Sequence, residues 1–195
     1  VNGSLFMSIA PDQIGKEYIH FSYTENSTLD AFNFRGAFRA NQIFTIKKHF
    51  DRIEFVGENT NYYFDPNNAL AKAAKANINQ PILASEKIQK TAKADKDHVV
   101  IKLDDIFLSE AFDQIKPSPP TNMPPGFNMF NLGSLSKTKT KYSQIKNYPA
   151  NTDLVVDYVF ENVNPTNYGR LETTDARYVT VTIQHSLIEM PKNNF

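Results

Sequence analysis

The chain has 195 residues, and its 21 lysine and arginine residues balance 21 aspartate and glutamate residues, so the formal net charge is zero. This length fits one domain and is enough to bury a core without staples. The balanced charge argues against a dedicated nucleic-acid binder and an obligate binder of anionic membranes, and the absence of cysteine excludes disulfides and thiolate metal sites.

The sequence contains no familiar catalytic or cofactor motif. HExxH, GxSxG, P-loop and GxGxxG patterns are all absent, and the four histidines, His20, His49, His98 and His185, stand at no metal-ligand spacing. No apolar run approaches the length of a membrane-spanning helix. The sequence therefore predicts no enzyme activity, no cofactor, no metal and no membrane span. The start at Val1, without a methionine or an apolar leader, predicts a piece of a longer protein.

Alternating side chains predict β-strands in the first part of the chain. Residues 5–9 and 17–23 are expected to pair as a hairpin around a turn at 10–15. Residues 41–48 and 52–56 are expected to form two further strands. Within the strand 17–23, alternation places one set of side chains on one face, namely Tyr18, His20 and Ser22, and Ile19, Phe21 and Tyr23 on the other.

One firm helix is predicted over residues 67–77, which are rich in alanine and follow the capping residues Asp65 to Asn68. Residues 82–88 are ambiguous, because lysines recur at every third position from there on, at Lys87, Lys90, Lys93 and Lys96. This spacing suits a basic helical stripe or a strand that runs into a solvated loop. The loop is favoured, because no apolar stripe lies opposite the lysines.

Residues 99–103 predict a strand and residues 104–112 predict one or two helical turns. The proline-rich segment 116–128 predicts an irregular surface loop. Pro117 and Pro120 have the spacing of a PxxP ligand, but a plain loop is the preferred interpretation.

Two long strands are predicted in the last third, at 153–160 and 177–190. Valine, isoleucine, threonine and tyrosine dominate them because branched and aromatic side chains pack well on a pleated surface. One face of the first strand carries Leu154, Val156, Tyr158 and Phe160. The predicted fold is mainly β, with antiparallel sheets that are sandwich-like or α+β with the one helix, in a single domain over 1–195.

The chain has an opening strand, a Pro-Asp-x-x-Gly-Lys turn at 11–16, an aromatic-Pro-x-Asn turn at 148–151 and a closing strand with His-Ser-Leu at 185–187. This order of segments resembles a domain of unknown function that precedes the catalytic domain in large bacterial exported zinc metallopeptidases, which are related to the metzincins. The sequence departs from that pattern at Lys137, where arginine is expected, and in its long proline-rich insertion. The motif positions that we single out are Arg35, Gly36, Asp104, Ser136, Pro149, Asn151, His185, Ser186 and Pro191.

The resemblance implies that this chain is a non-catalytic accessory domain that packs beside and supports a catalytic domain. Zinc would then belong to that later domain, with its HExxH site, and the parent protein would be exported. The partner would be the catalytic domain of the same polypeptide. In this interpretation His185 is a structural signature of the family and not a catalytic base, and neighbouring Ser186 faces the opposite way on a strand.

Acidic residues offer two weaker site hypotheses. Asp104 and Asp105, with Asp97 or Asp113, have the oxygen chemistry of a calcium site, although capping of the turn at 106–111 explains them better. Paired carboxylates for glycosidase chemistry could come from Glu17, Glu54 and Glu58, although a solvated face explains these residues better. The four histidines could also converge on one metal, which a single sequence does not test.

Aromatic and basic residues support an alternative function, a free-standing β-sandwich module that binds a carbohydrate or a protein. Tyr62, Tyr63 and Phe64 could stack on sugar rings, although core packing is the preferred interpretation. The lysines near Tyr142 could form a polyanion patch, although lysine on an exposed edge strand is the simpler explanation; they are Lys137, Lys139, Lys141 and Lys146. A weaker third hypothesis is a hydrolase that uses scattered carboxylates.

Overall fold

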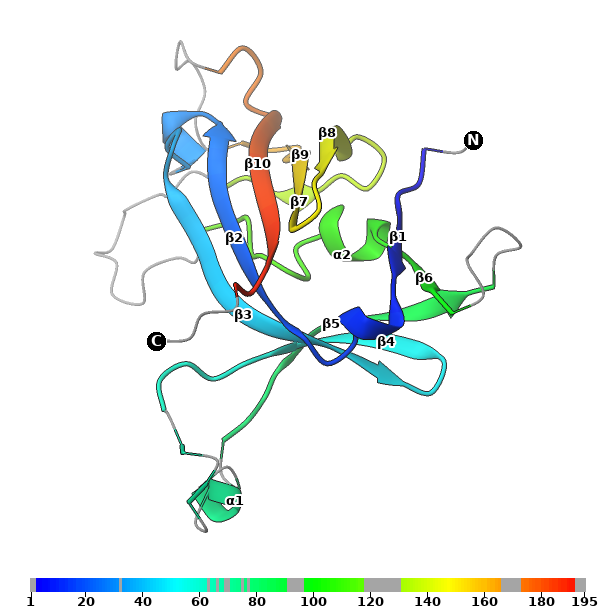
Figure 1. Cartoon of the computed structure of the whole chain (residues 1–195). Helices are drawn as coiled ribbons and strands as arrows, with labels where there is room; N and C mark the ends of the chain where they lie inside the picture. Colours follow the sequence, from blue (N-terminus) through cyan, green and yellow to red (C-terminus); the bar gives the residue numbers. More distant parts are fainter. Residues whose placement is uncertain are drawn as a thin grey trace. The chain divides into compact units, whose positions relative to one another are not determined.

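The computed structural model describes most of the chain, and its secondary structure is shown in Figure 1. The described residues are 3–31, 33–62, 64–65, 67–68, 71–74, 76, 78–90, 97–117, 131–165 and 173–191. The strands are β1 (Phe6–Ile9), β2 (Glu17–Asn26), β3 (Phe38–His49), β4 (Arg52–Gly57), β5 (Ile82–Gln89), β6 (Val99–Lys102), β7 (Ser134–Leu135), β8 (Lys141–Asn147), β9 (Asn151–Glu161) and β10 (Tyr178–Glu189). The helices are α1 (Ala71–Ala74), α2 (Asp104–Phe107) and the 3-10 turns η1 (Pro11–Gln13) and η2 (Leu29–Ala31).

The fold is a mainly antiparallel β-sheet, as the sequence predicts. Among the described residues, ten strands form one sheet, in which nine follow the order β1-β6-β5-β4-β3-β2-β10-β9-β7 and the tenth, β8, pairs with β9. The helix predicted over residues 67–77 is present only as the four-residue helix Ala71–Ala74; residues 67 and 68 form a turn and bend before it, and residues 69, 70, 75 and 77 lie outside the described residues. Of the proline-rich loop, residues 118–128 lie outside the described residues, as do Lys93 and Lys96.

The chain divides into two compact units. Unit 1 comprises Val1–His20, Asn41–Leu103 and Ile188–Phe195, and unit 2 comprises Phe21–Ala40 and Asp104–Leu187. Strands β2, β3 and β10 each contribute residues to both units. The single domain expected over residues 1–195 stays a prediction.

Unit 1 is built on the antiparallel pairs β1–β6, β6–β5, β5–β4 and β4–β3. Its interior holds aromatic rings in contact, with Tyr18 stacked on Phe44 at a centroid distance of 5.6 Å and Phe44 5.5 Å from Phe55. Ile53 and Ile101 are fully buried in the same unit. This packing follows from the alternation of apolar side chains along β3, β4 and β6.

The predicted hairpin between residues 5–9 and 17–23 is wrong. Strand β1 pairs with β6, where Phe6 lies opposite Lys102 and Ile9 opposite Val99. The connection to β2 does not fold back on itself, because Pro11–Gln13 forms a 3-10 turn that the Gln13 side chain closes by accepting a hydrogen bond from Ala10 N at 2.8 Å. The following Gly15 has φ of +86° and donates its N–H to Ile46 O at 2.8 Å, which ties the connection to β3.

Unit 2 has its core on the inner face of β9. Leu154, Val156, Tyr158 and Phe160 are all buried, as the alternation predicts. The side chains of α2 and the turn after it fill the same unit with Ile106, Phe107, Phe112 and Ile115. The chain enters α2 directly from the end of β6.

Candidate functional site

The side chains that β2 buries are mostly polar. This is unusual, because a strand with one polar and one apolar face ordinarily buries the apolar one. Residues of the buried set alternate along the strand and are Tyr18, His20, Ser22 and Thr24. The apolar Ile19 and Phe21 face the other way and are only half-buried. Buried polar groups lose their water and need partners inside the protein. The partners of Ser22 lie in unit 2, where they belong to the polar network that forms the candidate site.

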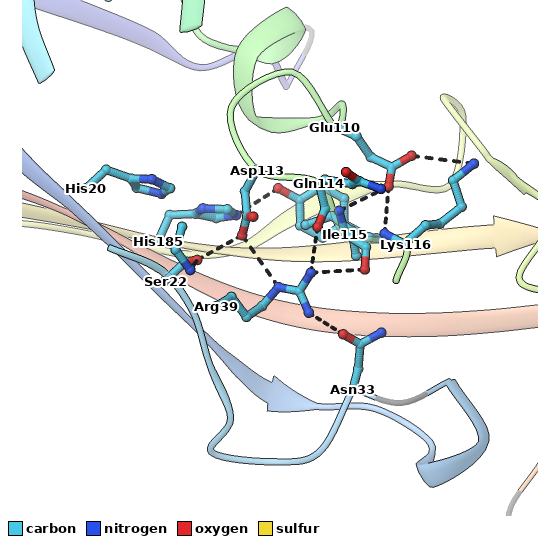
Figure 2. A network of polar contacts seen from close by, with 12 residues as sticks. His20, Ser22, Asn33, Arg39, Glu110, Asp113, Gln114, Ile115, Lys116 and His185 are labelled. Atoms are coloured by element: carbon cyan, nitrogen blue, oxygen red, sulfur yellow. Dashed lines mark hydrogen bonds and ion pairs between the residues drawn. The ribbon is translucent and has the colours of Figure 1, made fainter. Parts of the chain in front are cut away.

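An ion pair between Arg39 on β3 and Asp113 lies at the centre of this network (Figure 2). Arg39 Nε lies 3.5 Å from Asp113 Oδ2, and the two side chains are only 15% and 11% exposed. Ser22 Oγ donates a hydrogen bond of 2.8 Å to the same carboxylate oxygen. Ser22 Oγ in turn accepts the N–H of Ala40 at 3.0 Å, so the hydroxyl joins the carboxylate to the backbone of β3.

The guanidinium of Arg39 also holds the backbone of the segment that follows α2. Its Nη2 donates to the carbonyl of Gln114 at 2.7 Å and to that of Ile115 at 3.0 Å. Its Nη1 donates to Asn33 Oδ1, and Asn33 Nδ2 donates to Ala31 O at 3.0 Å. The planar fork of arginine thereby satisfies at once the Asn33 side chain, which follows η2, and two carbonyls of the turn after α2.

Glu110 secures the same turn from its other side. Glu110 Oε1 accepts the N–H of Ile115 at 3.0 Å and that of Lys116 at 2.8 Å. Lys116 Nζ lies 3.7 Å from Glu110 Oε2 and donates to Gly133 O at 3.3 Å. The network as a whole fixes residues 110–116 against β2 and β3 with side-chain charges in place of sheet hydrogen bonds.

His185 on β10 lies beside this network and bonds to Tyr158 on β9. The Tyr158 hydroxyl lies 2.8 Å from His185 Nε2, and both side chains are buried. The Phe107 ring packs edge-on against the imidazole at 5.4 Å. Burial raises the pKa of the Tyr158 phenol well above its ordinary value, and the charge of Asp113 adds to this effect. The pair therefore stays un-ionised at the phenol and acts as a buried hydrogen bond between two strands.

Ser186 does not share the environment of His185. Its hydroxyl accepts a hydrogen bond of 3.2 Å from Gln184 Nε2, two residues earlier on the same face of β10. Gln184 Oε1 accepts the hydroxyl of Tyr23 at 2.8 Å. The adjacent histidine and serine thus have separate partners on opposite faces, which is not the geometry of a nucleophile and its base.

His20 is the second fully buried histidine, and it belongs to unit 1. Gln42 Nε2 lies 3.2 Å from His20 Nδ1. Burial away from water lowers the pKa of the His20 imidazole to about 4. Since a free histidine has a pKa near 6.5, the folded chain keeps this ring neutral over a pH range in which the unfolded chain protonates it.

Stability is therefore expected to fall as the pH drops through the window between about 6.5 and 4. The unfolded chain takes up a proton on His20 in this window and the folded chain does not, which removes on the order of 3 kcal/mol of unfolding free energy when the window is crossed. Urea unfolding at a series of pH values measures this slope. The variant His20→Gln lacks the titrating group and should show a flatter profile, whereas equal slopes in both proteins would contradict the assignment to His20.

Most motif positions of the predicted family signature lie in turns or next to the ends of helices and strands. Gly36 has φ of +79° in the turn before β3, and its N–H donates to Thr24 O at 2.7 Å, while neighbouring Arg35 is exposed. Pro149 lies in the turn between β8 and β9, which is closed by Tyr148 N donating to Asn151 O at 2.8 Å. The remaining motif positions, apart from the two on β10, are Asp104 at the start of α2, buried Ser136 after β7 and Pro191 after β10.

The acidic residues are not gathered into a metal site among the described residues, where no group of three or more potential ligands occurs. Asp104 and Asp105 lie in the first turn of α2. Glu58 accepts hydrogen bonds from Thr45 Oγ1 at 2.8 Å and Gln80 Nε2 at 2.5 Å, and so joins β3 to the segment before β5. Glu17 and Glu54 lie on β2 and β4, exposed and half-buried.

The lysines near Tyr142 face acids, which weakens the polyanion hypothesis. Lys139 Nζ lies 2.7 Å from Glu161. In the β8–β9 register, Lys141 is opposite Asp157 and Lys146 is opposite Asp153. Strand β8 has β9 as its partner in the sheet and is almost entirely exposed, so the lysines of β8 lie on an edge strand.

The preferred interpretation of the aromatic run 62–64 as core is wrong for Tyr62. Its side chain is 63% exposed and stacks on Phe64 at 6.3 Å, and neither residue belongs to a strand. The polar residues around it, from Glu58 to Asn61, keep this segment at the surface. Tyr63 lies outside the described residues.

Comparison with known proteins gives one match. The model of the family described as "Domain of unknown function (DUF5117)" matches residues 38–195. Neither the curated proteins nor the solved structures contain a match to the chain. Within the described part of the chain, no helix has the length and apolar character to cross a membrane.

Proposed function

Because the chain belongs to the family described as "Domain of unknown function (DUF5117)", we propose that it is a non-catalytic accessory domain of an exported bacterial zinc-dependent metallopeptidase. It packs beside the zinc-bearing catalytic domain of the same polypeptide and stabilises it. We call that partner the catalytic segment. The zinc and the HExxH site belong to the catalytic segment.

One observation supports the scaffold role: the charged side chains in the interior bond to backbone groups and to one another. Arg39 bonds two backbone carbonyls, Glu110 bonds two backbone N–H groups, and Asp113 accepts Ser22 Oγ and pairs with Arg39. Groups so engaged hold the chain in shape and have little capacity left for a substrate. His185 supports the same interpretation, because its partner is the Tyr158 phenol.

The proposal is tested by preparing the chain and the catalytic segment separately and together. The chain alone should hydrolyse no casein and bind no stoichiometric zinc. The catalytic segment alone should be less thermostable than the joined protein, and adding the chain in trans should restore part of the difference, because binding to the folded state stabilises it. Hydrolysis by the chain alone that survives mutation of all four histidines would overturn the proposal, as would a following sequence without HExxH.

A binding module for glycans or proteins is the competing function, and exposed aromatics favour it. Phe38 on β3 is 80% exposed and lies 5.4 Å from Phe21 on β2. The two rings are tilted by 54°, so they do not form the flat platform that suits stacking against a sugar chain. The accessory-domain proposal is therefore preferred.

A further inference from the structure

The hairpin between β3 and β4 ends in an exposed phenylalanine with an unfavourable backbone. Phe50 is 84% exposed and has φ of +49°, and within the described chain it is the one non-glycine residue with a positive φ. Glycine and asparagine tolerate this region, whereas a bulky side chain there is a genuine outlier. A polar residue at this position would relieve both the backbone strain and the exposure of the ring.

Contacts within the hairpin hold the backbone on both sides of Phe50. His49 and Arg52 pair across the two-residue loop, so we call residues 49–52 the β3–β4 tip. Asp51 O accepts the N–H of Ile88 at 2.8 Å, and the His49 ring packs edge-on against Phe50 at 4.7 Å. The contact with His49 restricts the Phe50 ring, and a side chain that is already restricted loses less entropy when it inserts into a pocket.

The charges around the tip form a second unfavourable arrangement. Arg52 lies directly opposite Lys87 in the β4–β5 register. Like charges on opposed positions destabilise a sheet. Asp51, 3.7 Å from Lys87, offsets part of this charge, and both side chains are two-thirds exposed. Arg52 is anchored by hydrogen bonds to Ser85 Oγ at 2.8 Å and Ser85 O at 2.7 Å.

The β3–β4 tip thus carries an exposed phenylalanine with a positive φ and two opposed cations, Arg52 and Lys87. Such departures from local preference are expected at functional positions, which indicates that the tip is used for binding. We propose that the β3–β4 tip inserts Phe50 into an apolar pocket with a carboxylate rim on the catalytic segment, which rests on the proposed function. An exposed aromatic ring beside two cationic side chains, Arg52 and Lys87, has the composition of an interface anchor.

Other occupants fit the tip less well. Stable attachment to an anionic membrane takes a larger apolar surface or several more basic residues than one ring and a short basic row. A second copy of the chain would have to bring its own basic tip close to this one in a symmetric contact, and like charges would then repel. A carboxylate-rimmed pocket needs only one inserted ring, and its charge attracts the basic side chains of the tip.

The test compares the wild-type chain with Phe50→Asn in two measurements. Asparagine tolerates the left-handed backbone, so the isolated variant should melt a few degrees higher than wild type. Its dissociation constant for the catalytic segment, measured by calorimetry, should rise at least about tenfold. Tyr62→Asn, which removes another exposed aromatic of unit 1, is the matched control and should change neither value.

The variant Lys87→Glu tests whether the positive charge beside Phe50 attracts the catalytic segment. This reversal should slow association with the catalytic segment and reduce the dependence of that rate on salt, while dissociation changes less. Unchanged affinity in Phe50→Asn, with wild-type binding intact, would overturn the tip as the anchor and leave the proposed function standing. A wild-type chain that does not bind the catalytic segment would overturn both. Binding to phosphatidylserine vesicles or self-association that Phe50→Asn abolishes would overturn the assigned occupant.

Discussion

Arg39→Ala is expected to lower the unfolding free energy by about 3 to 5 kcal/mol, because it leaves the Asp113 carboxylate buried without its counter-charge. The same change removes the donors of Gln114 O and Ile115 O. Both side chains of the ion pair are largely shielded from water, so screening relieves little of this loss. Urea unfolding measures the total, and amide hydrogen exchange of residues 110–116 reports whether the turn is released first.

Arg35→Ala provides the control, because Arg35 lies four positions earlier in the chain and is exposed. Its loss should change stability by less than about 0.5 kcal/mol. Arg39→Lys should fall between the two, since lysine keeps the positive charge but cannot make the forked contacts. If Arg35→Ala and Arg39→Ala lose equal stability, the buried network does not hold the fold together.

The strands of this fold could largely be predicted from alternation alone. Leu154, Val156, Tyr158 and Phe160 share one apolar face in the sequence and are all buried in the structure. The same logic separates the two faces of β2 correctly but does not tell which is inside. The buried face is the polar one, because its partners come from segments remote in the sequence, such as Asp113, 91 residues from Ser22.

Strand pairing is the part that local patterns predict least well. The sequence favours a hairpin between the first two strands, yet β1 pairs with β6, whose residues lie 90 to 96 positions from their partners in the chain. A local turn motif indicates only that the chain changes direction. Which strand pairs with β1 depends on contacts between residues that are far apart in the sequence. Arg39 was missed for a related reason, since it lies on a strand without a motif, whereas the Arg35-Gly36 pair attracts attention as a turn. An arginine among apolar strand residues is the sequence feature that could have flagged it.

Gly133→Ala is expected to be among the most destabilising single substitutions in unit 2. Gly133 has φ of +79°, a region that costs an alanine about 1 to 2 kcal/mol. A Cβ at this position would also collide with the carbonyl oxygen of Glu161 and lie 2.8 Å from Asn162 Cβ. Backbone cannot move aside as a flexible side chain can, so overpacking adds about 1 to 3 kcal/mol or separates β7 from β9.

Gly36→Ala separates the two contributions, because Gly36 has the same φ of +79° but open space around its Cβ position. The unfolding free energy of this control should fall only by the cost of placing alanine at a positive φ, about 1 to 2 kcal/mol. The difference between the two variants then measures the close approach of Gly133 to β9. Protection of the Ser136 amide, which donates to Val159 O at 2.8 Å, should fall in Gly133→Ala and stay unchanged in Gly36→Ala. Equal losses in both proteins would mean that the contact with Glu161 relaxes freely and that β7 is not held there by the absence of a side chain.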